Sequence, residues 1–288
     1  MASLFEQLSE RIRNEQAVGL ATIIDGPGVG CRLFIVDDDQ EPSTAESPRE
    51  PDQAAPLPDA RGTLGNPELD RIVRRDALGE LEAGRSGIRH YGPTGQTTPE
   101  DLEGTPVVKV FIETWAPPPQ MWIFGAVDFT AALARAAKLL GYRVTVCDAR
   151  EIFATSRRFP MADEVIVTWP TPVFASRGHV LGSRDVVCVL THDAKFDVPA
   201  IVGALQTRVG YIGVMGSRHT HTKRLQRLAE VGVDQPEQLD RLMSPIGLDI
   251  GARTPEETAI SICAEIIARR TGRKVPSLRD SSGTIHGQ

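Results

Sequence analysis

The sequence lacks the features that mark membrane-spanning and secreted proteins. No apolar run approaches the roughly 20 residues needed to cross a bilayer, so we expect no membrane span. The first 15 residues lack a basic segment followed by an apolar one, so we expect no secretory signal. The cysteines lie far apart without a CxxC pair, which favours reduced thiols in a cytoplasmic protein over a disulfide framework. They are Cys31, Cys147, Cys188 and Cys263.

The sequence also lacks an excess of positive charge. The 288 residues carry 32 Lys and Arg against 38 Asp and Glu, a net charge of −6. Residues 1–115 hold 11 basic and 21 acidic side chains, whereas the remainder holds 21 and 17. Without a dominant basic surface, the chain is not expected to bind nucleic acid. The uneven charge fits two solvated surfaces, or two domains of which the second takes an anionic ligand.

The length allows one large domain or two modest ones, and three consecutive prolines at 117–119 favour two. We predict an N-terminal α+β domain over residues 1–116, a second domain over 117–271 and a C-terminal tail over 272–288. Within the first domain, residues 37–61 hold five prolines and eight acidic residues. Such a stretch buries too little to offset its ordering entropy, which predicts a disordered surface loop.

The second domain alternates between strands and helices. This pattern predicts a Rossmann-like α/β fold, a parallel sheet with helices on both faces. Ligands of such sheets bind beyond the C-terminal ends of the strands, so the loops there are the candidates for a site. The expected strands are 121–124, 143–147, 164–168, 186–190 and 211–214, and the expected helices are 128–140, 197–206, 217–231 and 254–270.

The first of these loops has few glycines. A dinucleotide fold uses G-x-G-x-x-G here, so that pyrophosphate can approach the backbone. Only Gly125 is present, and Val127 and Thr130 take the other glycine positions. Asp148 ends the next strand, where it would either bind a ribose or cap a loop. The pattern therefore indicates the fold more strongly than it indicates a dinucleotide.

The loop after the fourth strand contains His192 and Asp193, which would be acid–base or ligand groups, or would satisfy the backbone and cap the next helix. The segment from Gly213 to Arg218, which includes Gly216 and Ser217, ends the fifth strand and opens a helix. A helix N-terminus behind glycine, with hydroxyl and guanidinium donors, suits a phosphate. The other interpretation is an exposed basic helix face.

We expect no metal site on that helix. His219 and His221 are two residues apart and point to different faces. Further along, residues 254–257 form a capping box that explains the start of the last helix. The preceding Asp249 and Arg253 are left unexplained and would form an ion pair or face a ligand.

Several of these stretches carry a resemblance to a known family. Residues 211–218 and 245–257 closely resemble the C-terminal domain of the XdhC/CoxI family, and residues 189–193 and the tail at 277–286 are similar to it as well. The resemblance is specific over residues 117–288 and weaker over 1–116. It implies a small α/β domain followed by a Rossmann-like domain.

Members of this family help mature molybdenum hydroxylases such as xanthine and carbon monoxide dehydrogenases. They hold the molybdenum cofactor while its terminal sulfur is installed, and then deliver it. The resemblance therefore implies a molybdopterin-type cofactor, with a molybdenum hydroxylase apoenzyme and a cysteine desulfurase as partners. We also expect a homodimer.

The chain departs from the family in two loops. The family has a Gly-Gly-Cys segment in the first domain, where this chain has Gly65, Asn66 and, at the cysteine position, Glu68. We retain these three as candidate ligand residues at a helix start. The glycine-rich first turn of the Rossmann domain is also reduced to Gly125.

We expect a cofactor-binding accessory protein rather than an enzyme with its own turnover. One alternative is an NAD(P)-dependent oxidoreductase built on the Rossmann domain, which nicotinamide fluorescence quenching would reveal. Another is a scaffold whose sites have decayed.

Deleting residues 39–58 tests the predicted disordered loop. Because this segment is acidic, rich in proline and poor in apolar residues, its loss is expected to leave the melting temperature nearly unchanged. A large fall in a calorimetric scan would show that the segment packs against the folded protein.

Overall fold

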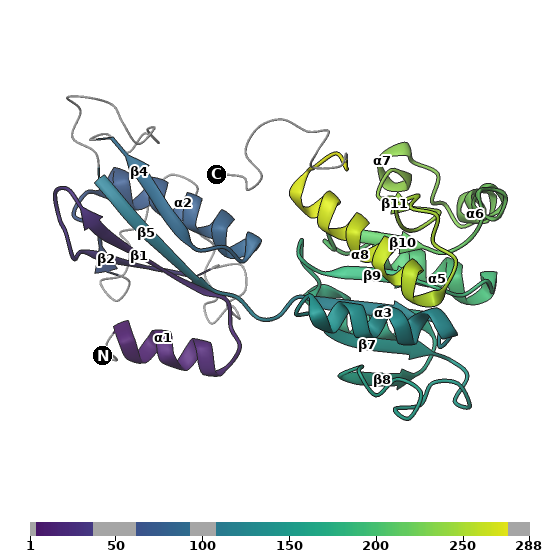
Figure 1. Cartoon of the computed structure of the whole chain (residues 1–288). Coiled ribbons are helices and arrows are strands. Elements are labelled where there is room, and N and C mark those ends of the chain that lie inside the picture. The colour runs from purple at the N-terminus through teal and green to yellow at the C-terminus, as the bar shows by residue number, and fades with distance from the viewer. Residues whose placement is uncertain (1–3, 37–61, 93–107, 276–288) are drawn as a thin grey trace, which may run out of the picture. The chain divides into compact units, whose positions relative to one another are not determined.

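The computed structural model describes residues 4–36, 62–92 and 108–275. The predicted loop at 37–61 and most of the predicted tail lie outside the described residues. The chain forms two compact units, Met1–Pro117 and Pro118–Gln288 (Figure 1). No helix among the described residues is long and apolar enough to cross a membrane.

The first unit is built on an antiparallel sheet in the order β3-β2-β1-β5-β4. Its strands alternate inward and outward side chains, as expected for period two. In the central strand, Ala21 and Ile23 join one apolar core, and Val18 and Leu20 join another. The strands are β1 (Val18–Asp25), β2 (Arg32–Ile35), β3 (Gly62–Thr63), β4 (Gly87–Tyr91) and β5 (Val108–Trp115).

One helix covers each face of this sheet (Figure 1). Helix α1 (Leu4–Arg13) places Leu8 against Val18 and Leu20, and helix α2 (Pro67–Ala83) places Val73 and Ala77 against the other face. Because both faces of the sheet are covered, this unit has a core of its own.

The second unit is a six-stranded parallel sheet in the order β11-β10-β9-β6-β7-β8. The chain starts in the middle at β6, moves to one side and then returns to β9 on the other side. The switch point of this Rossmann order therefore lies between β6 and β9. The strands are β6 (Gln120–Phe124), β7 (Arg143–Asp148), β8 (Glu164–Val167), β9 (Val186–Val189), β10 (Tyr211–Val214) and β11 (Leu242–Met243).

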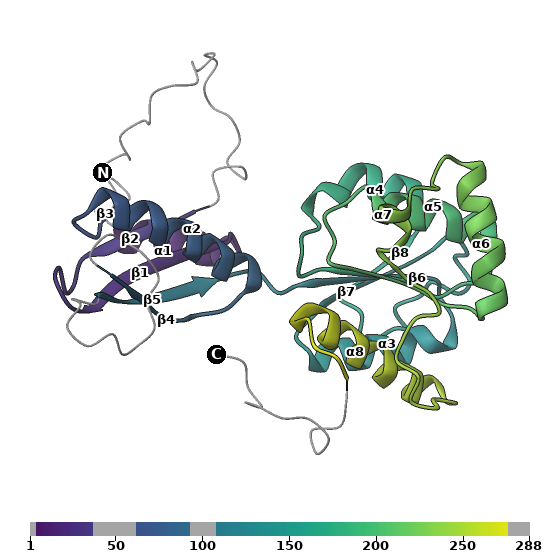
Figure 2. The ribbon, with the colours of Figure 1, turned by 90° about the horizontal axis from the view of Figure 1, so that it is seen from above.

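Helices cover both faces of the parallel sheet, as Figure 2 shows. Helices α3 (Asp128–Leu139) and α8 (Pro255–Thr271) pack on one face. The other face carries α4 (Pro170–Arg177), α5 (Ala194–Leu205) and α6 (Arg218–Glu230). A short 3-10 turn, Gly178–Val180, follows α4, and the short helix α7 spans Pro236–Leu239.

The predicted fold class is confirmed, with differences at several elements. Helix α4 is absent from the predicted elements, because Pro170 and Pro172 indicate a break; both lie in its first turn, where proline is tolerated. Helix α5 begins three residues before the expected start, because the Asp193 side chain accepts a hydrogen bond from Lys195 N at 3.0 Å and caps it there. The strands β3 and β11 are two residues long, too short to show a pattern.

Two helical glycines should respond oppositely to a methyl group. At Gly79 in α2, an added Cβ meets nothing within 4 Å, so Gly79→Ala is expected to stabilise its unit by about 0.5–1 kcal/mol through helix propensity. At Gly203 in α5, the Cβ would lie 2.3 Å from the Phe174 ring, so Gly203→Ala is expected to destabilise by about 1–3 kcal/mol. Calorimetry of the full-length variants checks both, and a stabilised Gly203→Ala would contradict the described packing.

Candidate functional site

The candidate site of the second unit lies at the carboxyl edge of its sheet. Parallel strands end at one edge, so the loops that follow β6, β7, β9, β10 and β11 gather there. At or just beyond these strand ends lie Gly125, Asp148, His192, Asp193, Gly216, Ser217, Arg218, Asp249 and Arg253.

The loops after β6 and β9 are pressed together at the switch point. Gly125 has φ +118°, and a Cβ there would lie 2.4 Å from Cγ2 of Thr191. Only glycine fits this backbone and this contact. Thr130, at the third position of the dinucleotide pattern, donates its hydroxyl hydrogen to Gly125 O and accepts from Val127 N at 3.4 Å. A side chain therefore closes the turn that glycines form in the dinucleotide motif.

Asp148 ties the loop after β6 to the end of β7. Its carboxylate accepts hydrogen bonds from Ala126 N at 2.7 Å, Arg150 N at 2.9 Å, and the Arg150 guanidinium at 2.8 and 3.0 Å. Burial raises the pKa of Asp148, but these bonds outweigh burial and hold the pKa below its usual value. Four donors fill the acceptor positions of one carboxylate.

The segment between β7 and β8 lies over the same loop. Arg158 donates to Ala126 O at 3.1 Å and to Phe153 O at 3.2 Å. The ring of Phe153 contacts two guanidinium groups, with the Arg150 carbon 4.7 Å and the Arg158 carbon 5.5 Å from its centroid. Arg150 and Arg158 are thus both engaged with the protein itself.

A buried ion pair joins the loops on the other side of the switch point. Arg224, on α6, lies 3.5 Å from a carboxylate oxygen of Asp197 on α5, and both side chains are about 95% buried. Arg224 also donates to Met215 O at 2.8 Å and to Ser244 Oγ at 3.1 Å, and Asp197 accepts from the Thr191 hydroxyl. The loops after β9, β10 and β11 therefore share one charged network.

Burial and charge oppose each other in this pair. Burial raises the pKa of Asp197, although the Thr191 hydroxyl and the Arg224 charge lower it. Burial also lowers the pKa of Arg224, against the pull of Asp197. On balance burial outweighs the attraction, so the pKa of Asp197 lies above its usual value and that of Arg224 below it, and each partner offsets only part of the desolvation of the other.

The two polar residues after β9 differ in how they are used. Asp193 caps α5 through its side chain, whereas His192 is exposed beside it. At the next strand, Gly213 lies inside β10, within the predicted strand 211–214. A Cβ there would lie 2.3 Å from Ile246, so this glycine lets the loop after β11 lie close to β10.

The loop after β10 presents an exposed arginine at a helix start. Gly216 has φ +146°, and Ser217 caps α6 by accepting from Thr220 N at 3.1 Å. Arg218 is the first residue of α6, and its side chain is exposed without a hydrogen bond or ion pair to the described residues. The Ser217 hydroxyl therefore serves the helix, and the Arg218 guanidinium is available to a ligand.

Asp249 and Arg253 are both exposed and form no ion pair with each other or with other described residues. The Arg253 backbone N–H donates to Glu257 at 2.7 Å, and Thr254 completes the predicted capping box. The hydrogen bonds at the start of α8 hold the end of this loop in place, and the side chains of Asp249 and Arg253 remain exposed to solvent.

In the first unit, the predicted loop residues shape the start of α2. Asn66 accepts from Glu68 N at 2.9 Å, and Gly65 has φ +90° with open space around its Cβ position. Glu68 is paired with Arg71, and the hydrogen bond from Arg71 lowers the pKa of Glu68. The buried Asp70 accepts a hydrogen bond from Leu64 N at 2.7 Å, which ties the loop to the first turn of α2.

The described thiols of the second unit are poor nucleophiles. Burial raises the pKa of Cys147 to about 12 and that of Cys263 to about 11, and raises the pKa of Cys188 well above its usual value. In the part of the chain that the structure describes, no group of three His, Cys, Asp or Glu side chains could hold a metal ion.

Sequence reasoning missed the residues that organise the site. The sequence pattern places Arg224 on a basic helix and nothing more, yet it lies four residues before the buried Leu228 and thus on the inner stripe of α6. This four-residue spacing is the sequence feature that could have placed Arg224 on the buried side of the helix. Arg150 and Arg158 gave no periodic signal, because they lie in a loop.

Comparison with known proteins assigns the family. The sequence model of the XdhC Rossmann domain matches residues 121–266, slightly more than half of the chain. The chain belongs to the XdhC family. The resemblance predicted from the strand-end loops is thereby confirmed, and the XdhC match covers every candidate residue of the second unit.

Three curated relatives are similar to this XdhC chain. A probable xanthine dehydrogenase subunit of Bacillus subtilis (strain 168) is 35% identical over 56% of this chain and 46% of its own length. Protein YqeB of Escherichia coli (strain K12) is 28% identical over 72% of this chain and 38% of its own. Molybdenum cofactor insertion chaperone PaoD of the same strain is 32% identical over 33% of this chain and 30% of its own. The chain thus spans less than half the length of each.

A solved structure shares the fold. The crystal structure of a xanthine dehydrogenase from Bacillus halodurans is 20% identical, with a TM-score of 0.50, and the match covers 96% of this XdhC chain and 98% of that chain. At this identity the likeness shows the fold alone.

Removing Arg224 should expose the cost of the buried carboxylate. Arg224→Met is expected to destabilise the second unit by about 3–5 kcal/mol, because Asp197 is left buried and unpaired. Arg224→Met with Asp197→Asn should lose less, and Arg227→Met on the exposed face should lose little. Urea unfolding measures all three.

The difference in unfolding free energy between the wild type and Arg224→Met, here called the deficit, should also depend on pH. Without Arg224 the pKa of Asp197 rises further in the folded state. A folded pKa above the unfolded value favours folding at low pH, and this contribution is lost as pH rises through the folded pKa. The deficit of Arg224→Met should therefore narrow as pH falls from about 8 to about 5. A constant deficit would show that Asp197 is not left charged.

Proposed function

We propose that this chain is an accessory protein that holds a molybdenum cofactor at the carboxyl edge of its Rossmann sheet and passes it to the apoenzyme of a molybdenum hydroxylase. The XdhC match over the strand-end loops carries the proposal. The Escherichia coli relative is named a molybdenum cofactor insertion chaperone, which supports transfer of the cofactor from this chain to the apoenzyme.

The start of α6 fits the phosphate end of a pterin cofactor. Acidic side chains lie in the first turns of α3, α5 and α8, where they offset the positive end of each helix. The first turn of α6 has none, and Arg218 begins it. A helix N-terminus with an adjacent guanidinium is a suitable anion site. When bound, the cofactor supplies the molybdenum chemistry of the client, and this chain binds and orients it.

We favour this ligand over a nicotinamide dinucleotide because of the loop after β6. The acceptor positions of Asp148 are filled by protein donors, so a ribose hydroxyl would have to displace one. Val127 stands where the pattern needs glycine for close approach of the pyrophosphate.

Two finer features belong to the same proposal. We assign the sulfur source to a separate cysteine desulfurase, because the thiols of the unit proposed to hold the cofactor, Cys147, Cys188 and Cys263, are buried with raised pKa values. We also propose a homodimer, which light scattering of the purified protein would test.

Copurification tests the function directly. The full chain, purified from a host that makes the cofactor, should carry molybdenum and pterin in a fixed ratio, measured by elemental analysis and by fluorescence of the oxidised pterin. Molybdenum and pterin at the level of an unrelated control protein would reject the proposal.

Arg218→Ala should weaken retention of the cofactor. Loss of a charge-assisted hydrogen bond corresponds to about a ten- to hundred-fold change in affinity. Arg227→Ala removes an exposed arginine further along α6 and should leave retention unchanged. The melting temperature of Arg218→Ala should stay close to that of the wild type, because the side chain is exposed and unpaired among the described residues. Equal cofactor content in both variants would show that Arg218 does not bind the cofactor.

A further inference from the structure

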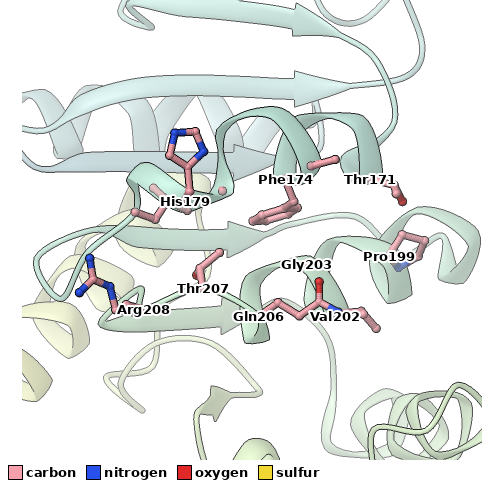
Figure 3. Close-up of a pocket in the computed structure, with 12 residues that line it drawn as sticks. Thr171, Phe174, His179, Pro199, Val202, Gly203, Gln206, Thr207 and Arg208 are labelled. Atoms are coloured by element: carbon pink, nitrogen blue, oxygen red, sulfur yellow. The ribbon is translucent and has the colours of Figure 1, made fainter. Parts of the chain in front are cut away.

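A concave surface lies between α4 and α5. It has a volume of about 590 Å³, and none of the candidate site residues lines it (Figure 3). Pockets for small organic ligands fall within about 300–1,000 Å³ and are mainly apolar with a few polar groups. This groove has the size and the composition of such a pocket.

The floor of the groove is aromatic. Phe174, on α4, is half-buried; its ring stacks on Phe124 at 5.1 Å and lies against Gly203 of α5. Since Gly203 has no side chain, the ring reaches into the space between the two helices, as Figure 3 shows. Pro199 and Val202 extend the apolar wall along α5. A flat apolar group could lie along this floor.

The polar groups of the lining are positive or neutral. Arg208 and His179 lie toward one end of the groove, beyond the last turns of α5 and α4 (Figure 3). Both are exposed, and neither side chain has a hydrogen bond or ion pair within the described part of the chain. No acidic residue among those described lines the groove.

The end of α5 does not require Arg208. Cations near a helix C-terminus commonly serve its free carbonyl groups. Here Arg241 does so, since it donates to Leu205 O at 2.8 Å, Thr207 O at 3.0 Å and Val209 O at 3.1 Å. The Arg208 guanidinium is therefore left with unused donors at the rim of an apolar groove.

We propose that the groove between α4 and α5 is a second ligand site, for a small organic anion with a flat apolar body. The body lies along Phe174, Pro199 and Val202, and the anionic group meets Arg208. The exposed side chains of Thr171 and Gln206 offer hydrogen bonds along the rim. This site is separate from the one proposed for the cofactor.

Anilinonaphthalene sulfonate, an anion with a flat naphthalene ring system, is a suitable probe. Titrated into the full chain and excited directly, its fluorescence should rise and saturate at one equivalent. Gln206→Trp, which places a bulky ring at an exposed position on the rim, should abolish the rise. The uncharged phenylnaphthylamine should bind at least about ten-fold more weakly than the sulfonate.

Arginine variants test whether Arg208 binds the sulfonate group. Arg208→Ala should weaken sulfonate binding by about ten-fold or more and leave phenylnaphthylamine binding unchanged. Arg227→Ala, an exposed arginine near the end of α6 on the same face of the sheet, is the matched control and should bind like the wild type. Circular dichroism confirms that each variant is folded. Equal binding by Arg208→Ala and Arg227→Ala, or undiminished binding by Gln206→Trp, would overturn the proposal.

Discussion

The buried ion pair between Asp197 and Arg224 is the interaction on which the carboxyl edge of the second unit depends. Each partner would be costly to bury alone, and together they hold a hydroxyl after β9, a carbonyl after β10 and a hydroxyl after β11. Loops are usually the most mobile part of a fold. Here one pair of charges fixes three of them, so the edge is set before any ligand arrives.

The other half of the edge is fixed by different means. Between β6 and β7, Asp148 gathers two backbone N–H groups and the Arg150 guanidinium, and Thr130 closes the turn behind Gly125. The contact between Gly125 and Thr191 then joins the two halves at the switch point. Changes at Gly125 should therefore affect the loops on both sides, since neither can move aside independently.

The sequence predicts the fold well because burial imposes a period on it. Short apolar runs separated by helical stretches identify most strands of the second unit. The pattern does not predict β11, because it is too short, or α4, because it begins with prolines. The site is predicted less fully. Strand ends locate His192, Ser217 and Arg218, but hydrogen-bond partners are set by tertiary packing, which leaves no local pattern. Arg224 is a charge on a buried stripe, and one sequence does not show what neutralises it.

The position of α6 constrains how a ligand could lie on the edge. Neighbouring strands are roughly 4.8 Å apart, and β9 separates β10 from β6, so the end of β10, where α6 begins, lies roughly 10 Å from the end of β6. A ligand whose phosphate is held at Arg218 would extend across the end of β9 to reach the loop after β6. The exposed residues that directly follow β9 are His192 and the helix-capping Asp193. If α6 holds the anion, the residues after β9 are the ones placed to distinguish the remainder of the ligand.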